Sequence, residues 1–493
     1  MAKNPTDRQN LGQFFTPEQI AEFILTRMNL SSKKTIADLS CGDGIFLTKA
    51  FDDLQKKSKN EIDTISKLYG LEIDQKILYQ ARNKLLKKCK KNSAKKIIKK
   101  NIIKMNTITN SVDVILKNFS FKNKEKGFDV IVGNPPYVTY RTSNSKIKKD
   151  PIFSQIIHGQ VNLATLVIGR AFSLLKKNGM LGLLLPKSLL RVKSYQKLRD
   201  FILKNFEIKC IVDVGEAFPD VRGEQIILIA QKKISTSNPV LIGNWDSKTK
   251  KPKLIKIQKS QLILNGIFQI YENKNTHKLI SKIISSHPTL EKVSDGKISR
   301  GIPIAANSKF VKSKHSPKYR KAIRGDSIQR FNFEYFLYIK EKKYPKLTDE
   351  IKGKKIVMQN IFSSESGIIA NFDEKGVIPL DSVTVVMPQS ENPYYILGIL
   401  NSKLVQFFMI FAIFAKSRLT MHTDKHYLGL IPIPKTNRKL KNQIIRSVKL
   451  SLKGKHDPQL NSLIYSAFSI SDKQIQLLEK ELTNFRNNGK KTS

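Results

Sequence analysis

The chain has 493 residues, and its 88 lysines and arginines against 40 aspartates and glutamates give a formal net charge of +48. With 40% hydrophobic and 26% charged residues, the composition is globular, and the length suffices for two or three domains of about 100–200 residues. Collagen-like, disulfide-stapled and wholly disordered chains are excluded. Cys41, Cys89 and Cys210 show neither CxxC nor zinc-ligand spacing, which favours a reducing compartment, so we expect a cytoplasmic protein.

No segment has the character of a signal peptide or a membrane span. The first ten residues lack an apolar core. The longest apolar run, Leu404 to Ala415, has 12 residues, well short of the roughly 20 that a spanning helix needs. It predicts a buried core helix, and we expect no membrane partner.

The surplus of positive charge favours a polyanionic partner, of which nucleic acids are the commonest in cells. Biased codon usage explains an excess of lysine equally simply. The ten lysines from Lys84 to Lys104 fit the solvated face of a helix better than a dedicated contact.

The first half of the chain alternates strand-like and helix-like segments, which is typical of a parallel sheet with crossover helices. A helix over 162–177 is expected to end at Asn178-Gly179. Residues 233–255 predict a linker or a domain edge, beyond which shorter strands and irregular turns indicate a separate α+β domain. Apolar runs predict strands over 35–39, 68–73, 128–133, 180–186, 208–215 and 225–233, the last joining the sheet antiparallel.

A glycine-containing loop from Asp38 to Gly44, with Ser40, Cys41 and Gly42 inside it, lies between the first predicted strand and a helix. Glycines let the backbone approach a ligand in front of a helix N-terminus, although a plain strand–helix turn also explains them. Glu72 ends the second strand, where an acidic residue can accept hydrogen bonds from both ribose hydroxyls. Because Asp38 and Asp43 make the loop acidic, the pattern favours a cationic ligand such as S-adenosylmethionine.

Asn134-Pro135-Pro136-Tyr137 follows the third predicted strand, at the edge where open α/β sheets place their sites. An amino group conjugated to an aromatic ring is a poor nucleophile because its lone pair is delocalised. The Asn134 side-chain oxygen and the Pro135 carbonyl can accept its two N–H groups and so localise that lone pair. The prolines stiffen the backbone without a competing N–H, and Tyr137 can stack on a flat substrate. An ordinary Asn-Pro-Pro turn is the alternative.

Together and in this order, these segments resemble the amino-group DNA methyltransferases of the gamma arrangement, the adenine-specific type of restriction–modification systems. The resemblance implies a Rossmann-like S-adenosylmethionine-dependent methyltransferase sheet, mostly parallel with its last strand antiparallel. It assigns Asn134, Pro135, Pro136 and Tyr137 to catalysis. It also assigns contacts to the cofactor, and these fall on Thr16 of the Gly12–Pro17 motif, Asp38, Ser40, Gly42, Gly44 and Glu72.

The resemblance extends to the second half of the chain. SRGIPIAANSKFV, GILNSKLVQFF and HYLGLIPIP resemble a TaqI-like target-recognition domain of α+β type. We therefore expect a catalytic domain over 1–240, a DNA-binding recognition domain over 241–440 and a helical tail over 441–493 that packs on the recognition domain.

Three of these residues have a second interpretation. The family usually places an acidic residue against the cofactor's adenine, where this chain offers Asn101, or Asn106 if the register differs. Thr16 also fits a helix N-cap. Phe218 stands where the family packs an aromatic against the flipped base, and it fits a core aromatic equally well.

Two further sequence features are weaker candidates for a metal site and for a nucleophile. His422 and His426 have metal-ligand spacing only on a helix, and we expect surface or DNA-facing histidines and no metal. Cys41 suits small-residue packing better than nucleophilic attack.

The expected activity is methyl transfer from S-adenosylmethionine to the 6-amino group of adenine in a specific sequence of duplex DNA, with the base extruded from the stack. The alternatives are an NPPY-type methyltransferase of RNA or of a protein glutamine, and a non-catalytic DNA-specificity module. We expect a monomer acting on double-stranded DNA, without a fused nuclease. A restriction endonuclease encoded separately is compatible with this expectation.

Overall fold

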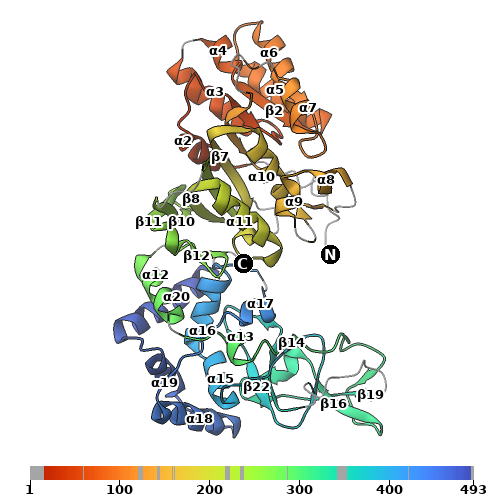
Figure 1. The fold of residues 1–493 in the computed structure, drawn as a ribbon, viewed down its shortest axis with the longest axis vertical. Helices are drawn as coiled ribbons and strands as arrows, with labels where there is room; N and C mark the ends of the chain where they lie inside the picture. The colour runs from red at the N-terminus through yellow and green to blue at the C-terminus, as the bar shows by residue number, and fades with distance from the viewer. Residues whose placement is uncertain are drawn as a thin grey trace. The chain divides into compact units, whose positions relative to one another are not determined.

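The computed structural model describes residues 16–489, except residues 59, 120, 122–125, 141–144, 158, 160, 217–222, 234–237, 272, 286, 341–350, 352 and 420. The chain divides into two compact units, residues 1–272 and 273–493, and each is described by itself (Figure 1).

The first unit is built on one nine-stranded sheet with the order β11-β10-β8-β9-β7-β4-β1-β2-β3. From β7 to β3 neighbouring strands run parallel, β9 is antiparallel to both β7 and β8, β10 is parallel to β8, and β11 returns antiparallel. The strands are β1 (Ile36–Asp38), β2 (Leu68–Glu72), β3 (Ile102–Lys104), β4 (Phe128–Gly133), β7 (Leu175–Pro186), β8 (Phe206–Gly215), β9 (Gln225–Lys232), β10 (Val240–Asp246) and β11 (Lys251–Ile257).

Helices connect the parallel strands and cover the sheet. Val130 and Val132, two positions apart on β4, point into a cluster built with apolar side chains of α2, α3, α5 and α6, as the two-residue period of a strand requires. The helices of this unit are α2 (Glu18–Thr26), α3 (Ile45–Lys57), α4 (Glu61–Ile65), α5 (Gln75–Lys88), α6 (Ala94–Asn101), α7 (Val112–Lys117), α8 (Ser145–Lys149), α9 (Phe153–Ile156), α10 (Leu163–Leu174) and α11 (Gln196–Asn205).

The strands predicted from apolar runs are confirmed, including the antiparallel strand over 225–233, which is β9. The predicted helix over 162–177 is too long, because α10 ends at Leu174 and β7 begins at the next residue. Leu175 already pairs with Phe128 of β4, so strand pairing takes over before Asn178-Gly179. The spacing of apolar residues along the chain gives no information about pairing with Phe128, which is distant in sequence.

The predicted linker over 233–255 is wrong for most of its length. Residues 240–246 and 251–257 form β10 and β11, which extend the sheet beyond β8. Trp245 of β10 packs edge-on against Phe23 of α2, with ring centroids 5.8 Å apart. The first unit therefore runs to Glu272 rather than to residue 240.

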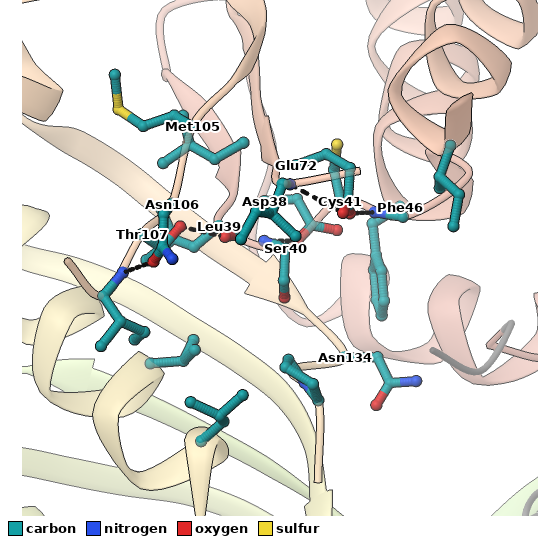
Figure 2. Close-up of a pocket in the computed structure, with 18 of the residues that line it drawn as sticks. Asp38, Leu39, Ser40, Cys41, Phe46, Glu72, Met105, Asn106, Thr107 and Asn134 are labelled. Carbon is teal, nitrogen blue, oxygen red and sulfur yellow. Dashed lines mark hydrogen bonds between the residues drawn. The ribbon is translucent and has the colours of Figure 1, made fainter. Parts of the chain in front are cut away.

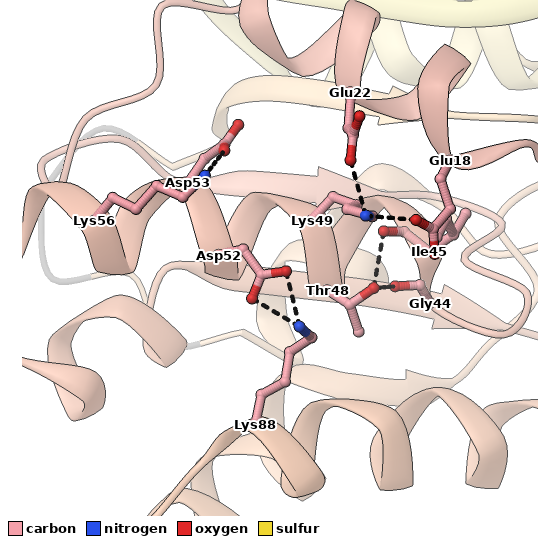
Figure 3. Close-up of polar contacts among 10 residues, drawn as sticks. All are labelled: Glu18, Glu22, Gly44, Ile45, Thr48, Lys49, Asp52, Asp53, Lys56 and Lys88. Carbon is pink, nitrogen blue, oxygen red and sulfur yellow. Dashed lines mark hydrogen bonds and ion pairs between the residues drawn. The ribbon is translucent and has the colours of Figure 1, made fainter.

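Ion pairs on the surface link the helices at the start of the unit. Lys49 of α3 binds Glu18 and Glu22 of α2, each at 2.8 Å, and Lys88 of α5 binds Asp52 of α3 at 2.8 Å (Figure 3). Both glutamates are more than half exposed, so such pairs contribute at most about 1 kcal/mol each. The buried face of α2 (Ile20, Ala21, Ile24 and Leu25) supplies most of its attachment.

The second unit combines short sheets with a helical layer. Two four-stranded sheets have the orders β14-β24-β20-β22 and β15-β19-β16-β23. Their strands are β14 (Ile298–Arg300), β24 (Val383–Val386), β20 (Lys355–Gln359), β22 (Ala370–Asp373), β15 (Val311–Lys312), β19 (Leu337–Lys340), β16 (Tyr319–Ile323) and β23 (Ile378–Pro379). The helices are α12 (Lys274–Ile284), α13 (Leu290–Val293), α15 (Pro393–Leu400), α16 (Lys403–Phe408), α17 (Lys425–Leu428), α18 (Arg438–Leu452), α19 (Leu460–Ala467) and α20 (Asp472–Gly489).

The apolar run from Leu404 to Ala415 is buried, as predicted, in α16 and the π-helical turn Met409–Ile413 that follows it. Among the described residues, no single helix has both the length and the apolar composition of a membrane span. Only α15 and Lys403–Ile413 taken together pass that test, and they meet at a 56° bend.

Candidate active site

A cavity of about 330 Å³ opens at the carboxyl ends of β1, β2, β3 and β4. Parallel strands place their carboxyl ends along one edge, where α/β sheets bind ligands. The wall of the cavity includes most of the residues that the sequence singled out, namely Thr16, Asp38, Ser40, Cys41, Gly42, Asp43, Glu72, Asn106 and Asn134 (Figure 2).

The loop after β1 is shaped by its glycines and by Glu72. Gly44 begins α3 with a φ of +84°, and a Cβ there would lie 3.1 Å from the Cβ of Ala81, so a larger residue would be strained. The Gly42 N–H donates to Glu72 Oε2 at 2.9 Å, while the N–H groups of Ile73 and Asp74 donate to Oε1. Three of about four acceptor positions of this carboxylate are therefore used, which leaves one for a ligand hydroxyl.

Asp38 is buried and lies against the backbone that leads into Asn134. Its Oδ1 accepts from the Ser40 N–H at 3.0 Å, and a Cβ at Gly133 would lie only 2.7 Å from the same oxygen. Only glycine at position 133 therefore leaves room for the carboxylate. Asp38 thus connects the loop after β1 to the residue that precedes Asn134.

Burial raises the pKa of Asp38 to about 8, because the Ser40 N–H offsets little of the desolvation and the charges of Glu72 and Asp43 add to it. Burial also raises the pKa of Glu72, more than its backbone hydrogen bonds lower it. Asp38 forms no ion pair among the described residues, whereas Asp43 pairs with Lys84. A cationic ligand would supply a positive charge beside these buried carboxyl groups and so favour their ionised form.

The loop after β3 supplies Asn106 to the wall of the cavity, whereas Asn101, which precedes β3, is not part of that wall. Asn101 ends α6 and donates its amide to the Ser66 carbonyl at 3.3 Å. Asn106 lines the cavity, and its Oδ1 accepts from the N–H groups of Ile108 and Thr109. Asn101 is therefore not among the residues that line the cavity, whereas Asn106, the residue of the alternative register, is.

Arg170 holds this loop in place, a role that the sequence analysis missed. Its buried guanidinium donates to the carbonyls of Thr107 and Ile108 at 3.1 and 3.2 Å and pairs with Asp150 at 3.2 Å. A single arginine within the otherwise apolar helix LATLVIGRAFSL was the available signal.

Asn134 and Tyr137 form a local pair at the end of β4. The Tyr137 hydroxyl donates to Asn134 Oδ1 at 2.6 Å, and the tyrosine packs against the apolar cluster under the sheet edge. Asn162, which caps α10, donates to the Tyr137 carbonyl at 2.6 Å. Asn134 and Pro136 line the cavity, whereas Pro135 and Tyr137 are not among its lining residues.

Thr16 is buried and lines the cavity, but it does not cap α2. The N-cap is Pro17, whose carbonyl accepts from Ile20 and Ala21, so the capping interpretation is wrong. Burial raises the pKa of the Cys41 thiol well above its usual value, which fits the packing role. Phe218 and the Gly12–Phe15 part of the N-terminal motif lie outside the described residues.

The two histidines of the metal alternative lie in different elements. His422 is in the short strand Met421–His422 and shares a hydrogen bond of 2.8 Å with Asn360, while His426 is in α17. No group of three or more potential metal ligands is found in the described part of the chain.

Comparison with known families divides the chain as the fold does. Residues 66–218 match the Eco57I restriction-modification methylase family, and residues 320–433 match the TaqI-like C-terminal specificity domain. The chain carries an Eco57I-type methylase domain and a TaqI-like specificity domain. The methylase match lies within the first unit and the specificity match within the second.

The chain is also similar to curated proteins that are much longer than the matched segments. One from Methanocaldococcus jannaschii, whose name places it among type II restriction enzymes and methyltransferases, is 27% identical over 361 residues, 68% of this chain and 30% of the relative. The type II restriction enzyme and methyltransferase RM.Eco57I of Escherichia coli is 26% identical over 38% of this chain and 23% of its own length. The chain thus spans less than a third of either relative.

A solved structure matches both domains together. The type IIL restriction-modification enzyme MmeI in complex with DNA superposes with a TM-score of 0.57 at 12% identity, covering 95% of this chain and 75% of MmeI. At this identity the similarity concerns the fold alone.

Proposed function

We propose that the chain is a DNA methyltransferase that moves a methyl group from S-adenosylmethionine to the 6-amino group of adenine in duplex DNA. One observation carries the proposal: Asn134, at the carboxyl end of β4, lines the same cavity as the acidic loop and Glu72. The methylase and specificity domains supply the class of substrate.

The cavity suits S-adenosylmethionine, which supplies an electrophilic methyl group when bound. Asp38 is a buried carboxyl group without a cationic partner among the described residues, and it would hold the ammonium end. Glu72 Oε2 would accept one ribose hydroxyl, and the Asn106 loop would border the adenine ring.

The NPPY segment would activate the target nitrogen. Asn134 Oδ1 and the Pro135 carbonyl accept the two N–H groups of the amino group, which concentrates its lone pair toward the methyl donor. The nitrogen would gain the methyl group as the sulfur–methyl bond breaks, with S-adenosylhomocysteine as the leaving group, and would then release a proton to solvent, so no strong base is needed. The Tyr137 hydroxyl donates to Asn134 Oδ1, so base binding requires this hydroxyl to move away or to share the oxygen.

The direct test is the identity of the methylated product. Purified protein with methyl-labelled S-adenosylmethionine and duplex DNA is expected to yield labelled N6-methyladenine, at one sequence context when the modified sites are mapped. Label in N4-methylcytosine would contradict the choice of base, and label in RNA or protein alone would contradict the choice of substrate.

Binding of S-adenosylmethionine is expected to release about one proton between pH 6 and 7.5. The folded pKa of Asp38, about 8, exceeds its ordinary value of 3.8, so the empty pocket holds the neutral acid and a bound cation drives its ionisation. By the same linkage, this group removes stability from the ligand-free protein as pH rises from about 4 to about 8. Calorimetry in two buffers of different ionisation heat measures the released proton.

Asp38→Asn is the control for that release. It keeps the size of the side chain and its acceptor for the Ser40 N–H, and it should bind S-adenosylmethionine more weakly without releasing this proton. Equal proton release by wild type and Asp38→Asn would show that another group titrates.

A further inference from the structure

The specificity domain contains a long stretch of positive charge without any carboxylate. Between Asp295 and Asp326 the sequence has nine lysines and arginines and no acidic residue. Two short parts of this stretch form β15 and β16, which flank β19 in one sheet. The strand register therefore decides which of these charges share a surface.

The register places the lysines on the outer face of this sheet. Lys312 pairs with Tyr338 and Tyr338 with Lys321, so the three form one row across β15, β19 and β16. On the opposite face Val311, Leu337 and Ile339 pack with Ala322 in an apolar cluster. Since side chains alternate between faces along a strand, the row points outward, together with the neighbouring pair Tyr319 and Lys340. The surface called here the lysine–tyrosine face consists of Lys312, His315, Tyr319, Lys321, Tyr338 and Lys340.

Aromatic rings support the charged groups of this face. Lys312 Nζ lies 4.9 Å from the centre of the Tyr319 ring, and Lys321 Nζ lies 4.8 Å from that of Phe336. His315 packs edge-on against Tyr338 at 5.3 Å. Such contacts hold an ammonium group over a ring without neutralising it.

These ammonium groups have no carboxylate partner in the part of the chain that the structure describes. Lys312, Lys321 and Lys340 are exposed and form no ion pair there. On the methylase domain, by contrast, Lys84 and Lys88 of α5 pair with Asp43 and Asp52. The lysine–tyrosine face is thus a preformed cationic surface rather than a set of internally paired charges.

We propose that the lysine–tyrosine face binds the phosphate backbone of duplex DNA, a proposal that rests on the proposed function. Phosphate contacts come mainly from lysine and arginine and set the position of a protein on DNA without reading its sequence. Lys312 and Lys321 are two strand spacings apart, roughly 10 Å, so they reach separate phosphates. The aromatic rings restrict where the ammonium groups lie.

The test compares two triple variants of the full chain. Lys312→Gln/Lys321→Gln/Lys340→Gln removes the three charges of the face, and Lys95→Gln/Lys96→Gln/Lys100→Gln removes three exposed lysines of α6. The affinity for duplexes with and without the methylated site is measured against KCl concentration. The face variant is expected to lower the slope of log K against log salt by about 2.7, or about 0.9 per lost phosphate contact. The affinity for both duplexes should fall by the same factor in the face variant, and the α6 variant should keep the wild-type slope.

Each other outcome overturns the proposal in a distinct way. An equal decrease of the slope in both triple variants would assign the effect to net charge. Loss of discrimination between the two duplexes by the face variant would assign the face to base reading. An unchanged slope in the face variant, while the wild-type protein methylates DNA, would reject the proposed role of the face and leave the proposed function standing. A wild-type protein that neither binds nor methylates DNA would reject the proposed function itself. Lys312→Gln and Lys321→Gln, tested singly, should each lower the slope by about 0.9, which covers the case in which the triple variant misfolds.

Discussion

Asn134→Ala is expected to lose about 100- to 1,000-fold in methyl-transfer rate, the loss typical of removing one preorganised hydrogen-bonding group from an active site. The substitution removes Oδ1, which we propose to accept an N–H of the target amino group as the nitrogen becomes tetrahedral. The proposal places Asn134 at the target amino group and assigns the cofactor to Asp38 and Glu72, so binding of S-adenosylmethionine should persist. Single-turnover transfer of labelled methyl to duplex DNA measures the rate, and calorimetry measures the binding.

Two variants separate the acceptor from its surroundings. Asn134→Asp keeps an oxygen acceptor and should lose less than Asn134→Ala. Tyr137→Phe keeps the ring and removes only the hydroxyl that donates to Oδ1, so it should stay within about tenfold of wild type, whereas Tyr137→Ala also loses stacking, worth about 1–3 kcal/mol. Equal rates for wild type and Asn134→Ala would end the catalytic assignment.

The parts of the site that the sequence predicted are those set by local order along the chain. Asp38, Glu72 and Asn134 each stand within one residue of the carboxyl end of a strand, and apolar runs locate strand ends well. Parallel pairing then brings the three to one edge. The same logic failed for Asn101, because α6 continues to that residue and leaves only Ile102–Lys104 for β3.

The parts that were missed depend on partners far away in sequence. Arg170 stands out as the one arginine of its helix, but the carbonyls that it binds lie more than 60 positions earlier, and no local pattern identifies them. Strands β10 and β11 were mistaken for a linker because the turn between them is polar and β11, KPKLIKI, carries lysines at the edge of the sheet. Edge strands expose one side to solvent, so a polar composition does not exclude pairing.

A buried ion triad ties together the strand ends beside the site. Lys187 follows β7, and its ammonium binds Asp213 of β8 at 2.8 Å and Glu224, directly before β9, at 3.0 Å. All three side chains are at most 7% exposed. Asp213 and Glu224 flank residues 217–222, the segment that contains Phe218 and lies outside the described residues. The triad therefore joins β8 to the start of β9, the two strands between which Phe218 stands in the sequence.

Lys187→Ala is accordingly expected to lower the free energy of unfolding of the methylase domain by about 3–5 kcal/mol, because it leaves two buried carboxylates without their cation.

Burial alone would lower the pKa of Lys187, but attraction by Asp213 and Glu224 outweighs it and raises that pKa above 10.5. The stabilisation in wild type is therefore complete at neutral pH and is lost only as pH rises through that raised value. Denaturant unfolding at neutral pH measures the difference. Lys233→Ala is the matched control: its partly exposed lysine pairs with Glu207 and should change the free energy of unfolding by about 1 kcal/mol or less. Equal destabilisation by the two substitutions would show that the triad has no special part in holding these strand ends.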